Sequence, residues 1–97
     1  MAESRKILIV EDDKDISMIE EAYLKAAGFE TDIVDDGEKV CEMVEQEKYA
    51  LILLDLMLPG KSGYDVCREI RDKVDIPIIM VTARTESVDY LGFLVLF

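Results

Sequence analysis

The sequence alternates between short aliphatic runs and longer segments in which apolar residues recur about every 3.6 positions. The runs at residues 7–10, 51–54 and 76–81 have almost no polar face, which is typical of strands buried on both sides in a parallel sheet. A shorter, half-apolar run at residues 29–34 predicts a fourth strand. Because strand and helix alternate with short links, the pattern predicts βαβ units with right-handed crossovers and helices on both faces of one parallel sheet.

Three helices are predicted between these strands, each with an apolar stripe that should face the sheet. The first is expected to end at Gly28, a residue suited to a helix C-terminus. A turn at residues 35–37 opens the second helix, and the third begins at about Ser62. The expected inward residues are Ile16, Ile19, Tyr23, Leu24 and Ala27 in the first helix, Val40, Met43 and Val44 in the second, and Val66, Ile70 and Val74 in the third.

Acidic residues follow two of the predicted strands. Glu11, Asp12 and Asp13 come after the first strand, and Asp55 ends the third. The carboxyl ends of parallel strands meet at one edge of the sheet, which is where open α/β sheets bind their ligands. Asp13 is expected to cap the first helix. Carboxylates about 4 Å apart repel by roughly 4 kcal/mol at an effective dielectric constant near 20. We therefore expect a hard divalent cation, Mg²⁺, at Glu11, Asp12 and Asp55.

A carboxylate beside Mg²⁺ is equipped to attack a phosphoryl group, because the metal neutralises charge on the phosphoryl oxygens. Asp55 would be the nucleophile and would become an aspartyl phosphate. Thr82 follows the fourth strand and could donate a hydrogen bond to a phosphoryl oxygen, or it could simply finish the strand. A haloacid-dehalogenase-like phosphatase, which also uses a nucleophilic Asp with Mg²⁺, is disfavoured. Such an enzyme would need a second Asp two residues after the nucleophile, where this chain has Met57.

The composition restricts the partners of the chain. Its 97 residues fit one domain, and its net charge of −11 argues against nucleic acid and anionic membranes as partners. The absence of histidine excludes His-based metal sites and catalytic triads. Cys41 and Cys67 lie in helix-like segments without metal-ligand spacing, which favours reduced thiols in a cytoplasmic protein.

Three blocks of residues occur in order along the chain. They are Lys-Ile-Leu-Ile-Val-Glu-Asp-Asp at 6–13, Leu-Ile-Leu-Leu-Asp-Leu-Met-Leu-Pro-Gly-Lys-Ser-Gly at 51–63, and Pro-Ile-Ile-Met-Val-Thr-Ala-Arg at 77–84. Together they resemble the receiver domain of two-component response regulators, over residues 5 to about 89, and in particular the winged-helix transcription-factor branch of that family.

The resemblance implies a flavodoxin-like (CheY-like) three-layer αβα fold with a parallel sheet in the order 2-1-3-4. It implies that Asp55 accepts a phosphoryl group from the phosphohistidine of a histidine kinase. Glu11, Asp12, Asp55 and the backbone carbonyl of Met57 would bind Mg²⁺, and Thr82 would be the switch hydroxyl drawn inward by the phosphate. Such a domain is modified through its own chemistry with a phosphodonor and is not a turnover enzyme.

The chain departs from the family pattern after the fourth strand. The expected division is a truncated receiver domain at residues 1–84 and an atypical apolar tail at residues 85–97, with the family's fifth strand and helix missing or replaced by the tail. No lysine follows Lys73, so the family lysine that contacts the phosphate has no counterpart. We therefore expect impaired phosphorylation, with Lys61 or Lys14 as a partial substitute.

The tail carries a prediction of its own. It could begin as a helix and end as a helix or a strand. Because a parallel crossover normally needs a dozen or more residues, we expect the strand at 76–81 to be an open sheet edge that pairs with other chains. This predicts a homodimer or higher oligomer with the tail at the interface. It also leaves an alternative function, a non-signalling scaffold that self-associates through its tail and open edge.

Overall fold

The computed structural model describes residues 5–56, 58, 60–81 and 94–96. The strands are β1 (Lys6–Val10), β2 (Glu30–Val34), β3 (Leu51–Asp55), β4 (Ile78–Val81) and β5 (Leu94–Leu96). The helices are α1 (Lys14–Ala26), α2 (Val40–Gln46), which continues a short 3-10 turn η1 (Gly37–Lys39), and α3 (Gly63–Arg71). None of the helices within these described residues is both long and apolar enough to cross a membrane.

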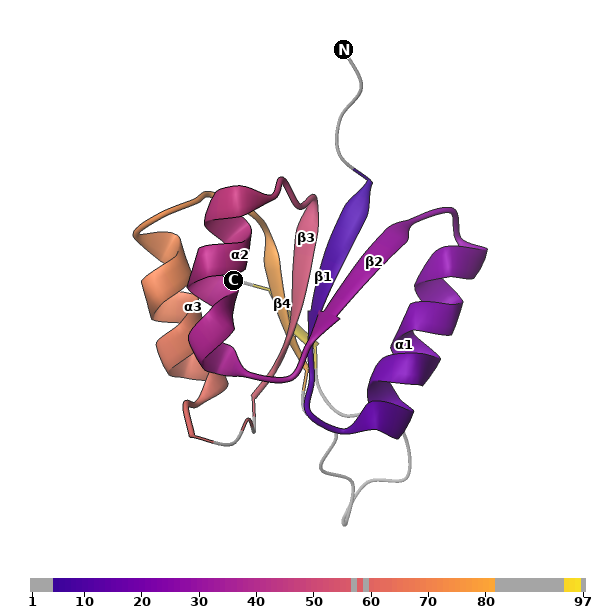
Figure 1. The fold of residues 1–97 in the computed structure, drawn as a ribbon, viewed down its shortest axis with the longest axis horizontal. Coiled ribbons are helices and arrows are strands. Elements are labelled where there is room, and N and C mark those ends of the chain that lie inside the picture. Colours follow the sequence, from indigo (N-terminus) through magenta and orange to yellow (C-terminus); the bar gives the residue numbers. More distant parts are fainter. Residues whose placement is uncertain (1–4, 57, 59, 82–93, 97) are drawn as a thin grey trace.

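The strands form one sheet in the order β2-β1-β3-β4-β5. The pairings among the first four strands are all parallel. Figure 1 shows α1 on one side of the sheet and α2 and α3 on the other. The predicted three-layer, flavodoxin-like arrangement with strand order 2-1-3-4 is therefore confirmed.

The main hydrophobic core lies between the sheet and the helices α2 and α3. Alternate strand residues point into it, because successive side chains of a strand face opposite sides. Its members include Leu8, Val10, Ile52, Leu54, Ile78 and Met80 from the strands, and Val40, Val44, Val66 and Ile70 from the helices. These four helix residues are buried as predicted, while Met43 and Val74 are partly buried at its margin.

Helix α1 packs less completely than its periodicity predicts. Ile16 and Leu24 are half-buried, but Ile19 is 57% exposed and Tyr23 is 75% exposed. The prediction that Ile19, Tyr23 and Ala27 face the sheet is wrong. Among the described residues α1 is the only helix on its side of the sheet, where it packs on β1 and β2. A single helix on a broad face buries only the narrow stripe in direct contact with the strands.

The fifth strand corrects the prediction of an open edge at β4. Residues 94–96 pair with β4 in the antiparallel direction, with Val95 opposite Met80. The length requirement of a parallel crossover, on which the predicted open edge depended, does not apply to an antiparallel return. The end of the tail is thus a strand of the same chain. The helix expected at the start of the tail lies outside the described residues.

Candidate functional site

Three carboxyl groups converge at the carboxyl ends of β1 and β3. One oxygen from each of Glu11, Asp12 and Asp55 lies within 4.8 Å of the other two. The strand register brings them together: Val10 pairs with Leu54, so the residues that follow Val10 lie beside Asp55. Glu11 is 4% exposed and Asp55 is 7% exposed, whereas Asp12 faces solvent. The sequence expectation that these three residues gather at one edge is met.

Glu11, the buried glutamate of this cluster, favours its protonated form when no cation is present. Burial raises the pKa of Glu11 to about 8, and the nearby Asp55 carboxyl adds to the rise. The backbone N–H of Asp13 donates to Oε2 of Glu11 at 3.1 Å, which opposes part of that rise.

Asp13 belongs to the helix rather than to the cluster. Its Oδ1 accepts hydrogen bonds from the backbone N–H groups of Asp15 at 2.9 Å and Ile16 at 3.2 Å. These are two of the donors that a helix N-terminus leaves without an intrahelical partner. The prediction that Asp13 caps α1 is confirmed, and it separates the role of Asp13 from that of its neighbour Asp12.

Glu20, in α1, is a fourth acidic group that the sequence analysis missed. Its Oε1 is buried and has no hydrogen-bond partner among the residues that the structure describes. Burial raises the pKa of Glu20 to about 7, and the charge of Asp55 contributes to the rise. The signal was present in the sequence: Glu20 is one helical turn after Ile16, so it interrupts the stripe that faces the sheet. The acidic groups that interact with Asp55 therefore include a carboxyl group on α1.

A cavity of about 410 Å³ adjoins the acidic cluster. Glu11 and Asp12 line it together with Lys14 at the start of α1 and Lys39 at the end of η1. The cavity borders the cluster on its Glu11 and Asp12 side, and Asp55 is not among the described residues that line it. Two further predicted site residues, Met57 and Thr82, lie outside the described residues.

The sequence as a whole matches the profile of one protein family, the response regulator receiver domain, over residues 7–95. The chain belongs to this family. A receiver domain is a signalling module of two-component systems rather than a turnover enzyme, as the resemblance implied.

Solved receiver domains share this fold. The BeF3-activated receiver domain of RstA from Klebsiella pneumoniae is 35% identical, with a TM-score of 0.77 over 84% of this chain and 70% of that one. The receiver domain of a sensor histidine kinase from Pseudomonas aeruginosa, which has a magnesium ion in its active-site cleft, is 34% identical, with a TM-score of 0.78 over 87% and 71%. TrrA from Thermotoga maritima, in complex with Mg²⁺-BeF, is 35% identical, with a TM-score of 0.78 over 84% and 71%.

Proposed function

We propose that this receiver domain accepts a phosphoryl group on Asp55 from a histidine kinase, in a reaction that depends on Mg²⁺. The observation that carries the proposal is the convergence of Glu11, Asp12 and Asp55 within 4.8 Å at the carboxyl ends of two adjacent parallel strands. This is the edge at which open α/β sheets bind their ligands. Membership of the receiver family supports the same chemistry.

The residues of the cluster fit Mg²⁺. All three side chains offer carboxylate oxygens, the hard ligands that Mg²⁺ prefers, and the exposed Asp12 leaves room for the water that this ion retains. Among the described residues, neither Glu11 nor Asp12 forms an ion pair with a lysine or arginine that would neutralise its carboxylate. Glu11, Asp12, Asp55 and the backbone carbonyl of Met57 would hold the ion. When bound, Mg²⁺ would offset the negative charge of the cluster and of the incoming phosphoryl oxygens.

Asp55 supplies the bond-forming atom. One of its carboxylate oxygens attacks phosphorus, the O–P bond forms as the P–N bond of the phosphohistidine breaks, and the released imidazole nitrogen keeps the electron pair. We propose that the hydroxyl of Thr82 donates a hydrogen bond to the transferred group. This 97-residue chain has no lysine after Lys73 and so no counterpart of the family lysine that contacts the phosphate. We propose that the chain therefore reacts about ten- to a hundredfold more slowly than a receiver domain that has this lysine, because one hydrogen bond to a charged group is lost.

Acetyl phosphate tests the proposal without requiring the cognate kinase. The purified chain is incubated with acetyl phosphate, with and without Mg²⁺, and its intact mass is followed over time. We expect one phosphoryl adduct that forms only with Mg²⁺ and is absent from Asp55→Asn. An equal adduct in Asp55→Asn, or no adduct in the parent chain after prolonged incubation, would contradict the proposal.

The alternative, a non-signalling scaffold, loses part of its support because β5 occupies the edge of β4 that was expected to be open. The homodimer or higher oligomer through the tail is untested, and it competes with a second role for residues 94–96, which cover the edge of β4 within the same chain. We further propose that the domain belongs to the winged-helix branch, on the resemblance of its three blocks. We also propose a cytoplasmic location, with which the free thiols of Cys41 and Cys67 agree. The proposed division of the chain is a receiver unit at 1–84 and a tail at 85–97.

A further inference from the structure

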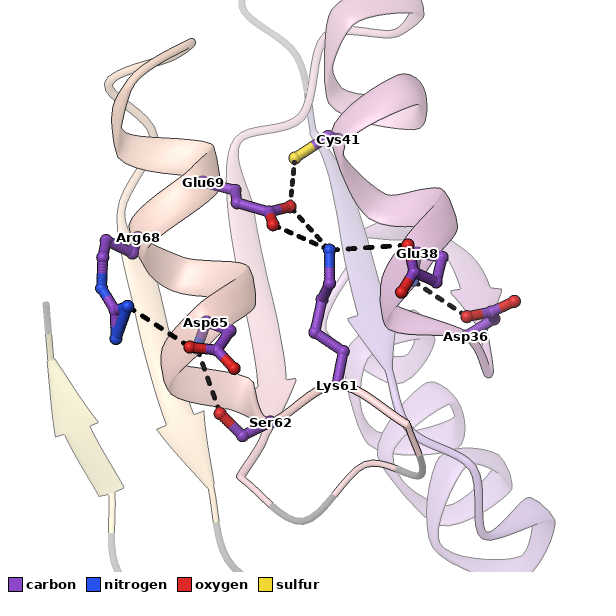
Figure 2. A network of polar contacts seen from close by, with 8 residues as sticks. All are labelled: Asp36, Glu38, Cys41, Lys61, Ser62, Asp65, Arg68 and Glu69. Atoms are coloured by element: carbon purple, nitrogen blue, oxygen red, sulfur yellow. Dashed lines mark hydrogen bonds and ion pairs between the residues drawn. The ribbon is translucent and has the colours of Figure 1, made fainter.

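Lys61 lies in the loop between β3 and α3, and its ammonium group is bound by two glutamates. Its Nζ donates to Oε1 and Oε2 of Glu69 in α3, at 2.9 and 2.8 Å, and lies 3.6 Å from Oε1 of Glu38 in η1. Cys41 in α2 donates from Sγ to Oε1 of Glu69 at 3.4 Å. Figure 2 shows how this network joins the loop to η1, α2 and α3.

The network holds Lys61 in its charged form and fixes its side chain. Hydrogen bonding to Glu69 raises the pKa of Lys61, and the same contact lowers the pKa of Glu69. The Lys61 side chain is only 17% exposed, so solvent competes for it less than for a typical surface lysine. Because its ammonium group already bonds both oxygens of Glu69, Lys61 is poorly placed to substitute for the family lysine at the phosphate.

The loop that carries Lys61 returns directly onto the phosphoacceptor. Gly63, two residues later, donates its backbone N–H to the carbonyl of Leu56 at 3.1 Å. A Cβ at Gly63 would lie 2.6 Å from the backbone oxygen of Asp55 and 2.9 Å from Cα of Leu56. The start of α3 therefore touches the backbone of Asp55 so closely that only glycine fits. A displacement of the loop at Lys61 would be transmitted to this contact.

We propose that Lys61 is a positioning residue for Asp55. By tying the loop to η1 and α3, it holds the contact between Gly63 and the Asp55–Leu56 backbone, and with it the orientation of the nucleophile. The inference rests on the proposed function of Asp55. The two can be tested separately, because the contact itself can be observed without phosphorylation.

Three variants separate this role from a general contribution to stability. Lys61→Met removes the ammonium group, Glu69→Gln weakens its main partner, and Lys73→Met is the matched control. Lys73 forms another surface ion pair on this side of the molecule, 3.1 Å from Glu45 in α2. Its charge also acts on Glu69, so Lys73→Met controls for the loss of a positive charge near Glu69 that leaves the contacts of Lys61 with Glu69 and Glu38 intact. We expect Lys61→Met and Glu69→Gln to shift the backbone amide resonances of Leu56 and Gly63, and Lys73→Met to leave both in place.

The rate of phosphorylation by acetyl phosphate at saturating Mg²⁺ is the second readout. It should fall about two- to fivefold in Lys61→Met, the range expected for one partly exposed ion pair. The double variant with Glu69→Gln should fall no further, because both changes break the same link. Failure of the parent chain to form an adduct would refute the proposed function, while the amide shifts would still decide the positioning role. Unshifted resonances of Leu56 and Gly63 in Lys61→Met, equal shifts in Lys73→Met, or an unchanged rate would each overturn it.

Discussion

Glu11, Asp12 and Asp13 are three consecutive acids with three different environments. Glu11 is buried against Asp55, Asp12 faces solvent at the rim of the cluster, and Asp13 caps α1. Sequence reasoning separated these roles because strand ends and helix starts follow simple rules. It could not foresee the Lys61 network, because Glu38 and Glu69 meet Lys61 only through the packing of η1 and α3.

The different roles of Asp12 and Asp13 predict different effects of the same substitution. Asp12→Asn removes one charged ligand and should weaken Mg²⁺ binding about tenfold or more. Asp13→Asn keeps a residue that caps helices well, so binding should change little. Calorimetric titration with Mg²⁺ measures both. Equal losses of affinity in the two variants would show that the assignment of Asp12 to the metal site is wrong.

At the scale of elements, the parallel part of the sheet could be predicted from the sequence, because continuous aliphatic runs are typical of strands that are buried on both faces. It failed where an element depends on a distant partner. The helical periodicity of α1 marked an apolar stripe but could not show how much of the sheet one helix would cover. The pairing of β5 with β4 was missed because nothing in residues 94–96 identifies the strand beside them.

The pairing of β5 makes a prediction about assembly. Deleting residues 94–97 would expose the hydrogen-bonding edge of β4, whose residues Ile78–Val81 are all apolar. Exposed edges of this kind pair with other chains, so the shortened chain should form larger assemblies than the full chain. Light scattering on a sizing column compares the two at equal concentration. A shortened chain of lower assembly mass than the parent would instead place the tail at an interface between chains.

For the whole molecule, the buried acids link folding to pH. The pKa of Glu11 is raised from 4.5 to about 8 in the folded chain, and that of Glu20 to about 7. The metal-free folded state therefore binds more protons than the unfolded state in this interval. The stabilisation is fully present below about pH 4.5 and is lost as the pH rises through about 8. Mg²⁺ requires the carboxylate form, so its affinity should rise over the same interval.

Urea unfolding tests this linkage. With a chelator present, the midpoint should be lower at about pH 9 than at about pH 6, and saturating Mg²⁺ should reduce or reverse the difference. The variant Glu11→Gln with Glu20→Gln should show a weaker dependence on pH in the chelator. A midpoint that rises with pH in the metal-free parent chain would contradict the protonated state inferred for Glu11 and Glu20.

We propose that the strand-end cluster makes Asp55 a Mg²⁺-dependent phosphoacceptor. Borohydride reduces an acyl phosphate to an alcohol, so treatment of the phosphorylated chain followed by peptide mass analysis locates the modified carboxyl group. We predict reduction at Asp55 alone, and only in samples that received both acetyl phosphate and Mg²⁺. Reduction at Glu11 or Asp12, or at Asp55 to the same extent without Mg²⁺, would contradict the account.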